Sequence, residues 1–184
     1  AVLTMLVIGV VMLFSTSAFA RDAHGDIYFF IKRQALWLGI GLTVLIAAAL
    51  IDYHFWYHTW WLWFLLAVGT LALCFVPHLG MRVNGSRRWV GAGPITFQPS
   101  EIAKIAAVFF LAWWFVRFEN RARNLIFGFI IPLTAAALLI SLIITEVDFG
   151  TSALIGATTV VVMFVAGTNP ILLGTFFATA LGGF

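Results

Sequence analysis

Long apolar runs separated by short polar segments dominate the chain. Most of these runs approach the roughly 20 residues that a helix needs to cross the hydrocarbon core of a bilayer. The pattern therefore predicts an all-α fold, a polytopic transmembrane helix bundle with about six or seven spans present. The predicted spans are residues 2–18, 35–51, 60–77, 101–116, 125–145 and 151–167, and a seventh that begins at Ile171.

Composition supports a membrane protein. The 184 residues are 63% hydrophobic and 9% charged, which is outside the range of soluble domains. No long polar stretch indicates a second domain, so residues 1–184 are interpreted as one integral membrane domain. The single Cys74 excludes an internal disulfide and a cysteine-based metal cage, and it is interpreted as a buried apolar filler.

Both ends of the chain look truncated. The first apolar run has neither an initiator Met nor a basic segment ahead of it, so it is interpreted as a clipped first span and not as a signal peptide. The last run ends at Phe184 without the polar cap or interfacial anchor that normally closes a span.

Positive charges are distributed unevenly between the two predicted faces. The positive-inside rule places the basic turn at residues 117–123 in the cytoplasm. Alternation of spans then places residues 19–34 and 78–100 outside, where Lys and Arg are more frequent than inside. Two interpretations follow: the orientation is reversed, or the outer charges have a function.

Residues 81–99 are too rich in Gly and Pro for a helix and too apolar for a free loop, so they are expected at the membrane interface. Gln98, Pro99 and Ser100 then open a helix, in which Ser100 is predicted to cap exposed N–H groups. Glu101 and Lys104 lie three residues apart on one helical face, where they can neutralise each other.

Arg87, Arg88, Gln98, Lys104 and the positive end of this helix together suit a phosphate or pyrophosphate. The alternative is anchoring to anionic lipid headgroups, with Glu101 and Lys104 as a structural pair.

A second polar segment, residues 145–153, places Glu146 and Asp148 on the same predicted side as these basic residues. Asp148 is expected close to the N-terminus of the sixth span, where negative charge is favoured. Three roles are open for it: a metal ligand, a base, or an ion pair with Arg87, Arg88 or Lys104.

Aromatic and histidine side chains cluster near the predicted ends of spans. Trp, Tyr and His residues there are interpreted as interfacial belts, and the four His residues are not predicted to bind metal. The residues concerned are Trp56, Tyr57, Trp60, Trp61, Trp63, Trp113, Trp114, His24, His54, His58 and His78.

Three motifs together resemble the SEDS family (shape, elongation, division and sporulation proteins). They are Gly85-Ser86-Arg87-Arg88-Trp89, Phe97-Gln98-Pro99-Ser100-Glu101-Ile102-Ala103-Lys104 and Asp148-Phe149-Gly150-Thr151. Order and spacing follow the family from about residue 8 to 170. The segment at residues 28–34 is more similar to the division branch, FtsW, than to the elongation branch, RodA.

The resemblance implies a peptidoglycan glycosyltransferase of the bacterial inner (cytoplasmic) membrane. Such a protein has ten spans and polymerises lipid II, the undecaprenyl-pyrophosphate-linked disaccharide peptide, on the outer face. It also implies a class B penicillin-binding protein and membrane lipids as partners, with no nucleic acid, and a cytoplasmic turn at residues 117–123.

The same resemblance implies the roles of the site residues. Arg87, Arg88 and Lys104 are implied to bind the pyrophosphate. The pocket around it is implied to be formed by Gln98, Ser100 and Glu101. Trp89 is implied to anchor its segment at the membrane interface. The substrate-binding set also includes Lys32, Arg33, Asp148, Gly150 and Thr151.

The sequence departs from the family pattern in one segment. Val147 replaces the usual Pro and Glu146 replaces a common Gln. The family's favoured catalytic Asp follows the seventh span and is expected beyond Phe184, so this fragment alone is expected to be inactive. A divalent cation, Mg²⁺ or Mn²⁺, would bridge pyrophosphate and a carboxylate such as Asp148.

Two other functions remain open. A lipid II transporter, or flippase, would use the same basic cavity without a catalytic acid. A non-catalytic scaffold of the division complex would use only the helix faces that contact partners.

Overall fold

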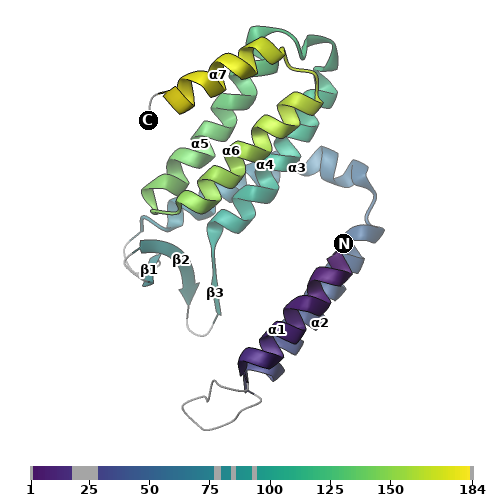
Figure 1. Cartoon of the computed structure of the whole chain (residues 1–184), viewed down its shortest axis with the longest axis vertical. Helices are drawn as coiled ribbons and strands as arrows, with labels where there is room; N and C mark the ends of the chain where they lie inside the picture. The colour runs from purple at the N-terminus through teal and green to yellow at the C-terminus, as the bar shows by residue number, and fades with distance from the viewer. Residues whose placement is uncertain (1, 18–28, 77–79, 84–85, 93–94, 183–184) are drawn as a thin grey trace. The chain divides into compact units, whose positions relative to one another are not determined.

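The computed structural model describes residues 2–17, 29–76, 80–83, 86–92 and 95–182 (Figure 1). The chain divides into two compact units, Ala1–Asp52 and Tyr53–Phe184. Each unit is described by itself.

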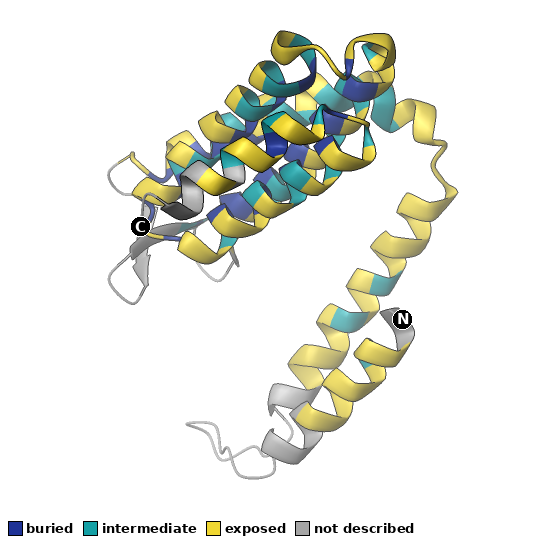
Figure 2. Ribbon diagram, turned by 45° about the horizontal axis from the view of Figure 1, so that its top comes forward, coloured by how far each residue is buried: buried dark blue, intermediate teal, exposed yellow. Residues whose placement is uncertain are grey.

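The first unit is a pair of apolar helices. Helix α1, Val2–Ser17, contacts α2, Phe29–Leu50. Figure 2 shows that their described side chains are mostly exposed, since two helices alone cannot enclose a core. Residues Lys32–Leu50 are long and apolar enough to cross a membrane, so the exposed side chains of this unit suit a lipid environment.

The second unit is a helix bundle that contains the buried core (Figure 2). Two more of its segments have the length and hydropathy of membrane spans, Pro99–Arg117 and Leu125–Thr145, and Phe149–Val165 is a shorter apolar helix. The prediction of an all-α bundle is confirmed. The helices of this unit are α3 (Tyr53–Leu73), α4 (Pro99–Arg117), the 3₁₀-helix η1 (Glu119–Arg121), the π-helix η2 (Leu125–Ile130), α5 (Ile131–Thr145), α6 (Phe149–Val165) and α7 (Pro170–Gly182).

Helix α4 lies at the centre of this bundle and contacts α3, α5 and α6. Its buried face carries Ala103, Ala106 and Ala107, whose small side chains let the neighbouring helices approach closely. Leu71 of α3 and Ile143 of α5 complete the same cluster and are fully buried. The helix that carries the site described below is therefore packed tightly into the core of the bundle.

A three-stranded antiparallel sheet precedes α4, in the order β1–β2–β3. Its strands are β1 (Gly80–Val83), β2 (Ser86–Ala92) and β3 (Ile95–Phe97), and Val90 pairs with Phe97. The sequence excluded a helix for this segment and placed it at the membrane interface, but it did not predict the strands. Gly91 pairs with Thr96 in the ladder, so glycine in this segment does not prevent strand pairing.

The Trp residues predicted as interfacial belts also pack inside the bundle. Trp60 of α3 stacks on Trp113 of α4 with ring centroids 4.1 Å apart. The indole N–H of Trp114 donates to the backbone oxygen of Phe127 at 2.8 Å. Trp61, in contrast, is 52% exposed and retains the surface position expected of a belt residue.

Candidate functional site

Asp148 is the centre of a hydrogen-bonded cluster at the beginning of α6. It is the N-cap of this helix and is buried, with 7% of its surface exposed. The backbone N–H of Thr151 donates to Oδ1 at 3.1 Å, and the Thr151 hydroxyl donates to Oδ2 at 2.8 Å. The predicted position of Asp148 at the helix N-terminus is confirmed, and Thr151 is the residue that fixes its carboxylate.

The same carboxylate connects α6 to α4. The Gln98 side-chain amide donates to Asp148 Oδ2 at 2.8 Å, and the Ser100 hydroxyl lies 3.5 Å from the same oxygen. Hydrogen bonds between residues 50 and 48 positions apart in sequence therefore connect the N-terminal ends of α4 and α6. This connection fixes the N-terminus of α4, the helix that carries Glu101 and Lys104.

The prediction that Ser100 caps α4 is wrong. Because Pro99 occupies the first helical position, Gln98 is the N-cap, and its side chain makes no capping hydrogen bond. Ser100 is fully buried instead and faces Asp148. Ser100 lies inside the helix, one residue after Pro99, and its hydroxyl donates to a carboxylate that the sequence alone does not place beside it.

Glu101 and Lys104 form the ion pair predicted from their spacing. Lys104 Nζ lies 2.7 Å from Glu101 Oε2, one turn into α4. The Lys104 side chain is 31% exposed and that of Glu101 is 60% exposed, so both charges remain accessible to a ligand. A pair of this kind is weak in water, and an anionic group could displace Glu101 from Lys104.

Arg87, Arg88 and Trp89 belong to β2, and this strand contacts α4. Trp89 is half-buried, whereas the side chains of Arg87 and Arg88 lie outside the described residues. Gly150 is exposed, and a Cβ there would lie 3.8 Å from Asp148 Oδ1, an ordinary contact. Lys32 and Arg33 are exposed on α2 in the first unit.

The sequence did not indicate the environment of Glu146. This residue follows α5 and is only 2% exposed. No N–H or O–H group of the described residues donates to either carboxylate oxygen, and the weak thiol donor of Cys74 lies beside them. Burial raises the pKa of Glu146 to about 7, the nearby Cys74 thiol lowers it in part, and the Asp148 charge raises it further.

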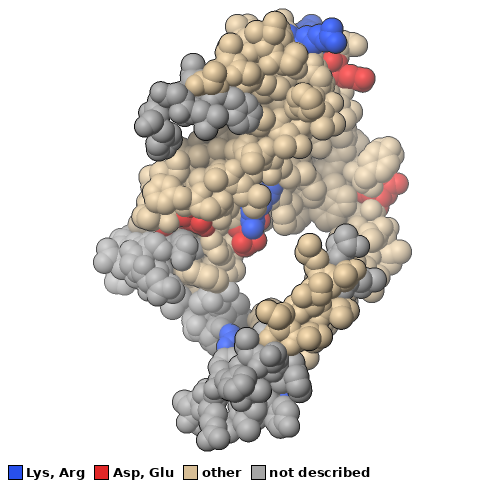
Figure 3. Space-filling view, viewed as in Figure 1, with Lys and Arg blue, Asp and Glu red and all other residues tan. Residues whose placement is uncertain are grey.

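No group of three or more metal-ligating side chains comes together among the described residues. Asp148 accepts hydrogen bonds from Gln98 and Thr151, which gives its carboxylate a positioning role. Among the described residues on the face shown in Figure 3, charged side chains are few, and in places Lys or Arg lies beside an acidic residue.

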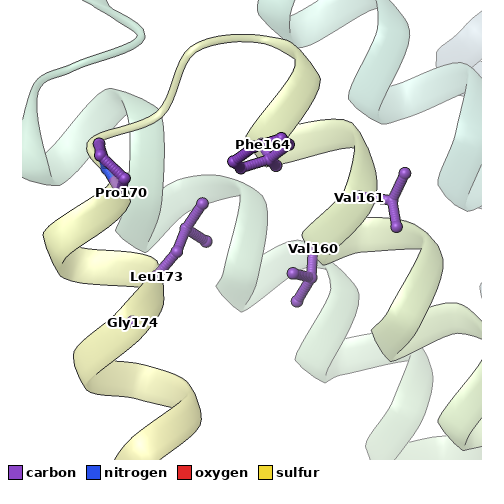
Figure 4. A pocket seen from close by; sticks show the side chains of 6 residues that line it. All are labelled: Val160, Val161, Phe164, Pro170, Leu173 and Gly174. Atoms are coloured by element: carbon purple, nitrogen blue, oxygen red, sulfur yellow. The ribbon is translucent and has the colours of Figure 1, made fainter.

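An apolar pocket between α6 and α7 carries no comparable chemistry. Figure 4 shows the residues that line it, whose side chains are all apolar. They are Val160, Val161, Phe164, Pro170, Leu173 and Gly174.

The fold and site define a multi-pass helical membrane protein with a charged and hydrogen-bonded cluster at one end of its central helix. A family model for cell cycle proteins of the FtsW, RodA and SpoVE type matches residues 1–183. The chain belongs to this family, and its similarity to relatives named FtsW supports the division branch.

Two curated relatives illustrate the match. The chain is 36% identical over 171 residues to a probable peptidoglycan glycosyltransferase FtsW of Legionella pneumophila, covering 92% of this chain and 43% of that protein. It is 35% identical over 169 residues to the stage V sporulation protein E of Bacillus subtilis, covering 91% and 46%. The chain thus spans less than half the length of these relatives.

Solved structures show the same fold. A chain from a structure titled as a peptidoglycan synthase complex that coordinates polymerization and crosslinking matches with a TM-score of 0.75 and 26% identity, covering 97% of this chain and 51% of that one. The rod shape determining protein RodA of Thermus thermophilus matches with a TM-score of 0.72 and 27% identity, covering 97% and 57%.

Proposed function

We propose that this chain is the N-terminal part of a peptidoglycan glycosyltransferase that polymerises lipid II on the outer face of the bacterial inner membrane, in cell division or cell-shape control. The observation that carries the proposal is the accessible Glu101–Lys104 pair beside the fixed Asp148 cluster. The names of the FtsW relatives support the activity.

In this proposal Lys104 binds the pyrophosphate of lipid II, and Arg87 and Arg88 contribute from the adjoining strand. A developing pyrophosphate charge needs donors that are already in place when the leaving group departs. The Asp148 hydrogen bonds provide such positioning, because they fix Gln98 and the beginning of α4. Lys32, Arg33, Trp89 and Gly150 are kept as proposed substrate contacts.

The proposed partner is a class B penicillin-binding protein. The similarity to a chain from a peptidoglycan synthase complex supports this partner class. We propose the same orientation as the sequence predicted, with residues 117–123 in the cytoplasm, and a divalent cation as an optional component of the bound pyrophosphate.

The first test replaces Lys104 by Ala in the full-length protein, purified with its transpeptidase. Lipid II polymerisation is expected to fall by at least about tenfold, because a charged hydrogen bond contributes on the order of 1.5–3 kcal/mol. Arg123→Ala is the matched control, since Arg123 is an exposed cation beyond the other end of α4. The amount of polymer, resolved by length on gels, measures the fall in polymerisation.

Two further readouts separate the alternatives. Lost polymerisation with intact transpeptidase binding would exclude a scaffold. Lipid II translocation in proteoliposomes that depends on Lys104, without any polymer formation by the parent protein, would favour a transporter. Unchanged polymerisation by Lys104→Ala would overturn the proposed site.

A further inference from the structure

Glu146 lies in an environment that disfavours a charged carboxylate. The residue is 2% exposed and follows the last residue of α5. Its backbone N–H donates to Ile143 O at 3.0 Å, yet no N–H or O–H group of the described residues donates to its side-chain oxygens, beside which only the weak thiol donor of Cys74 is described. A buried ion without donors or a counter-ion is among the most costly arrangements in a protein.

The titratable groups that face Glu146, among the described side chains, provide no positive charge. Cys74 approaches from the end of α3, and Asp148 lies two residues further along the turn. Lys104, on the neighbouring α4, is engaged with Glu101. Because Asp148 already accepts from Gln98 and Thr151, donors that suit an ionised carboxylate, Glu146 is the acid better suited to hold a proton.

The turn that carries Glu146 is strained at the next residue. Val147 has a φ of 60°, a left-handed conformation that β-branched residues rarely adopt. The turn is held by hydrogen bonds from Val147 N to Ile144 O at 2.9 Å and from Asp148 N to Ile143 O at 3.4 Å. Glu146 and Asp148 therefore belong to one short hydrogen-bonded turn at the end of α5.

We propose that Glu146 is a proton-binding site. Its uncharged acid form keeps the side chain buried and preserves the hydrogen-bonded turn between α5 and α6. Loss of the proton to water leaves a charged carboxylate in a buried site where the described side chains offer a weak thiol donor and no positive charge. The side chain then moves toward water, the strained Val147 relaxes, and the Asp148 connection to α4 loosens.

The direction of the pH effect follows from the raised pKa. The pKa of Glu146 rises from 4.5 to about 7 in the folded chain, mainly through burial. Below 4.5 both folded and unfolded chains carry the proton, so Glu146 makes its full contribution to stability. Between these two values the unfolded chain loses its proton first, and stability falls as pH rises.

The test compares the full-length parent protein with Glu146→Gln in lipid nanodiscs, from about pH 5 to about pH 8. The melting temperature of the parent is expected to decrease across this range. Most of this decrease is expected to be lost in Glu146→Gln, because the amide does not ionise. Glu119→Gln is the matched control, since Glu119 is exposed beyond the other end of α4 and its removal should leave the decrease intact.

Two measurements keep the inference testable if Glu146→Gln fails to fold. The infrared spectrum of the parent should show a protonated carboxyl band at about pH 6 that disappears by about pH 8. Hydrogen exchange of the Thr151 amide, corrected for its intrinsic pH dependence, should accelerate over the same range.

An absent infrared band, or equal pH dependence in the parent and Glu146→Gln, would overturn the proton site. A band without the change in Thr151 exchange would overturn the coupling to Asp148. Neither readout uses lipid II, so the inference is decided independently of the proposed glycosyltransferase activity.

Discussion

At the scale of single residues, Asp148 has two positioning functions. It caps α6 through the Thr151 N–H, and it holds Gln98 at the beginning of α4. Both functions use the same carboxylate, so the ends of the two helices are fixed relative to each other. The charged side chains of α4 are thereby placed by a residue that need not contact the substrate.

Replacing Thr151 by Val tests this arrangement with little change in shape. The variant removes the hydroxyl donor to Asp148 Oδ2 but keeps the backbone donor to Oδ1. We expect a loss of about 1 kcal/mol in the free energy of unfolding. Thermal denaturation in nanodiscs measures it. Thr158→Val on the same helix is the control, because its hydroxyl bonds only to Leu154 O; an equal loss there would contradict a special role for Thr151.

At the scale of elements, the turn from η1 into α5 depends on one glycine. The π-helix η2 begins after Asn124, whose side chain accepts from Ile126 N at 2.9 Å. The Thr168 hydroxyl donates to Gly128 O at 3.0 Å from the segment before α7. A π-helix is uncommon and persists only where surrounding contacts hold it.

Gly128→Ala is expected to destabilise this element strongly. An added Cβ would overlap the backbone carbonyl of Ala122, so main chain must move. We expect a loss of about 3 kcal/mol or more, which a lower melting temperature would show. Gly69→Ala is the contrasting variant: its Cβ meets nothing within 4 Å, and alanine favours α3 by about 0.5–1 kcal/mol. Similar losses in both variants would refute the steric explanation.

At the scale of the whole molecule, close packing around α4 supports the second unit. The alanines of α4 meet α3, α5 and α6 in one buried cluster. Outside this cluster the exposed surface is rich in large apolar side chains, which suits lipid and not water. Stability of the bundle therefore depends on close approach of helices more than on removal of apolar surface from water.

A larger side chain on the inner face of α4 should be costly. Ala106 is fully buried, and Ala106→Leu is expected to reduce the free energy of unfolding by about 1–3 kcal/mol through overpacking. Ala112→Leu places the same side chain on the exposed face of α4 and should be nearly neutral. Melting temperatures of the two variants in the same lipid would test this, and a neutral Ala106→Leu would contradict close packing at α4.

Much of this organisation could be predicted from the sequence. Apolar runs located the helices because each span must cover a length of hydrocarbon. The spacing of Glu101 and Lys104 predicted their ion pair, since residues three apart share a helical face. The motif order predicted the family, which the match over residues 1–183 confirms.

What failed were predictions that depended on long-range contacts. Ser100 was expected to cap its own helix, but it lies inside the helix after Pro99 and donates to Asp148. The strands β1 to β3 were missed because short pairing segments between glycines have no distinct hydrophobic period.

The sequence by itself determined the membrane setting, the helix positions and the local pair on α4, because all three depend on composition and on spacing within a few residues. Only the tertiary structure decided that Gln98 and Thr151 share one carboxylate and that Glu146 is buried beside the Cys74 thiol without an N–H or O–H donor from the described residues. Burial and hydrogen-bond partners are set by neighbours brought from distant parts of the chain, and no local pattern encodes which neighbours these are.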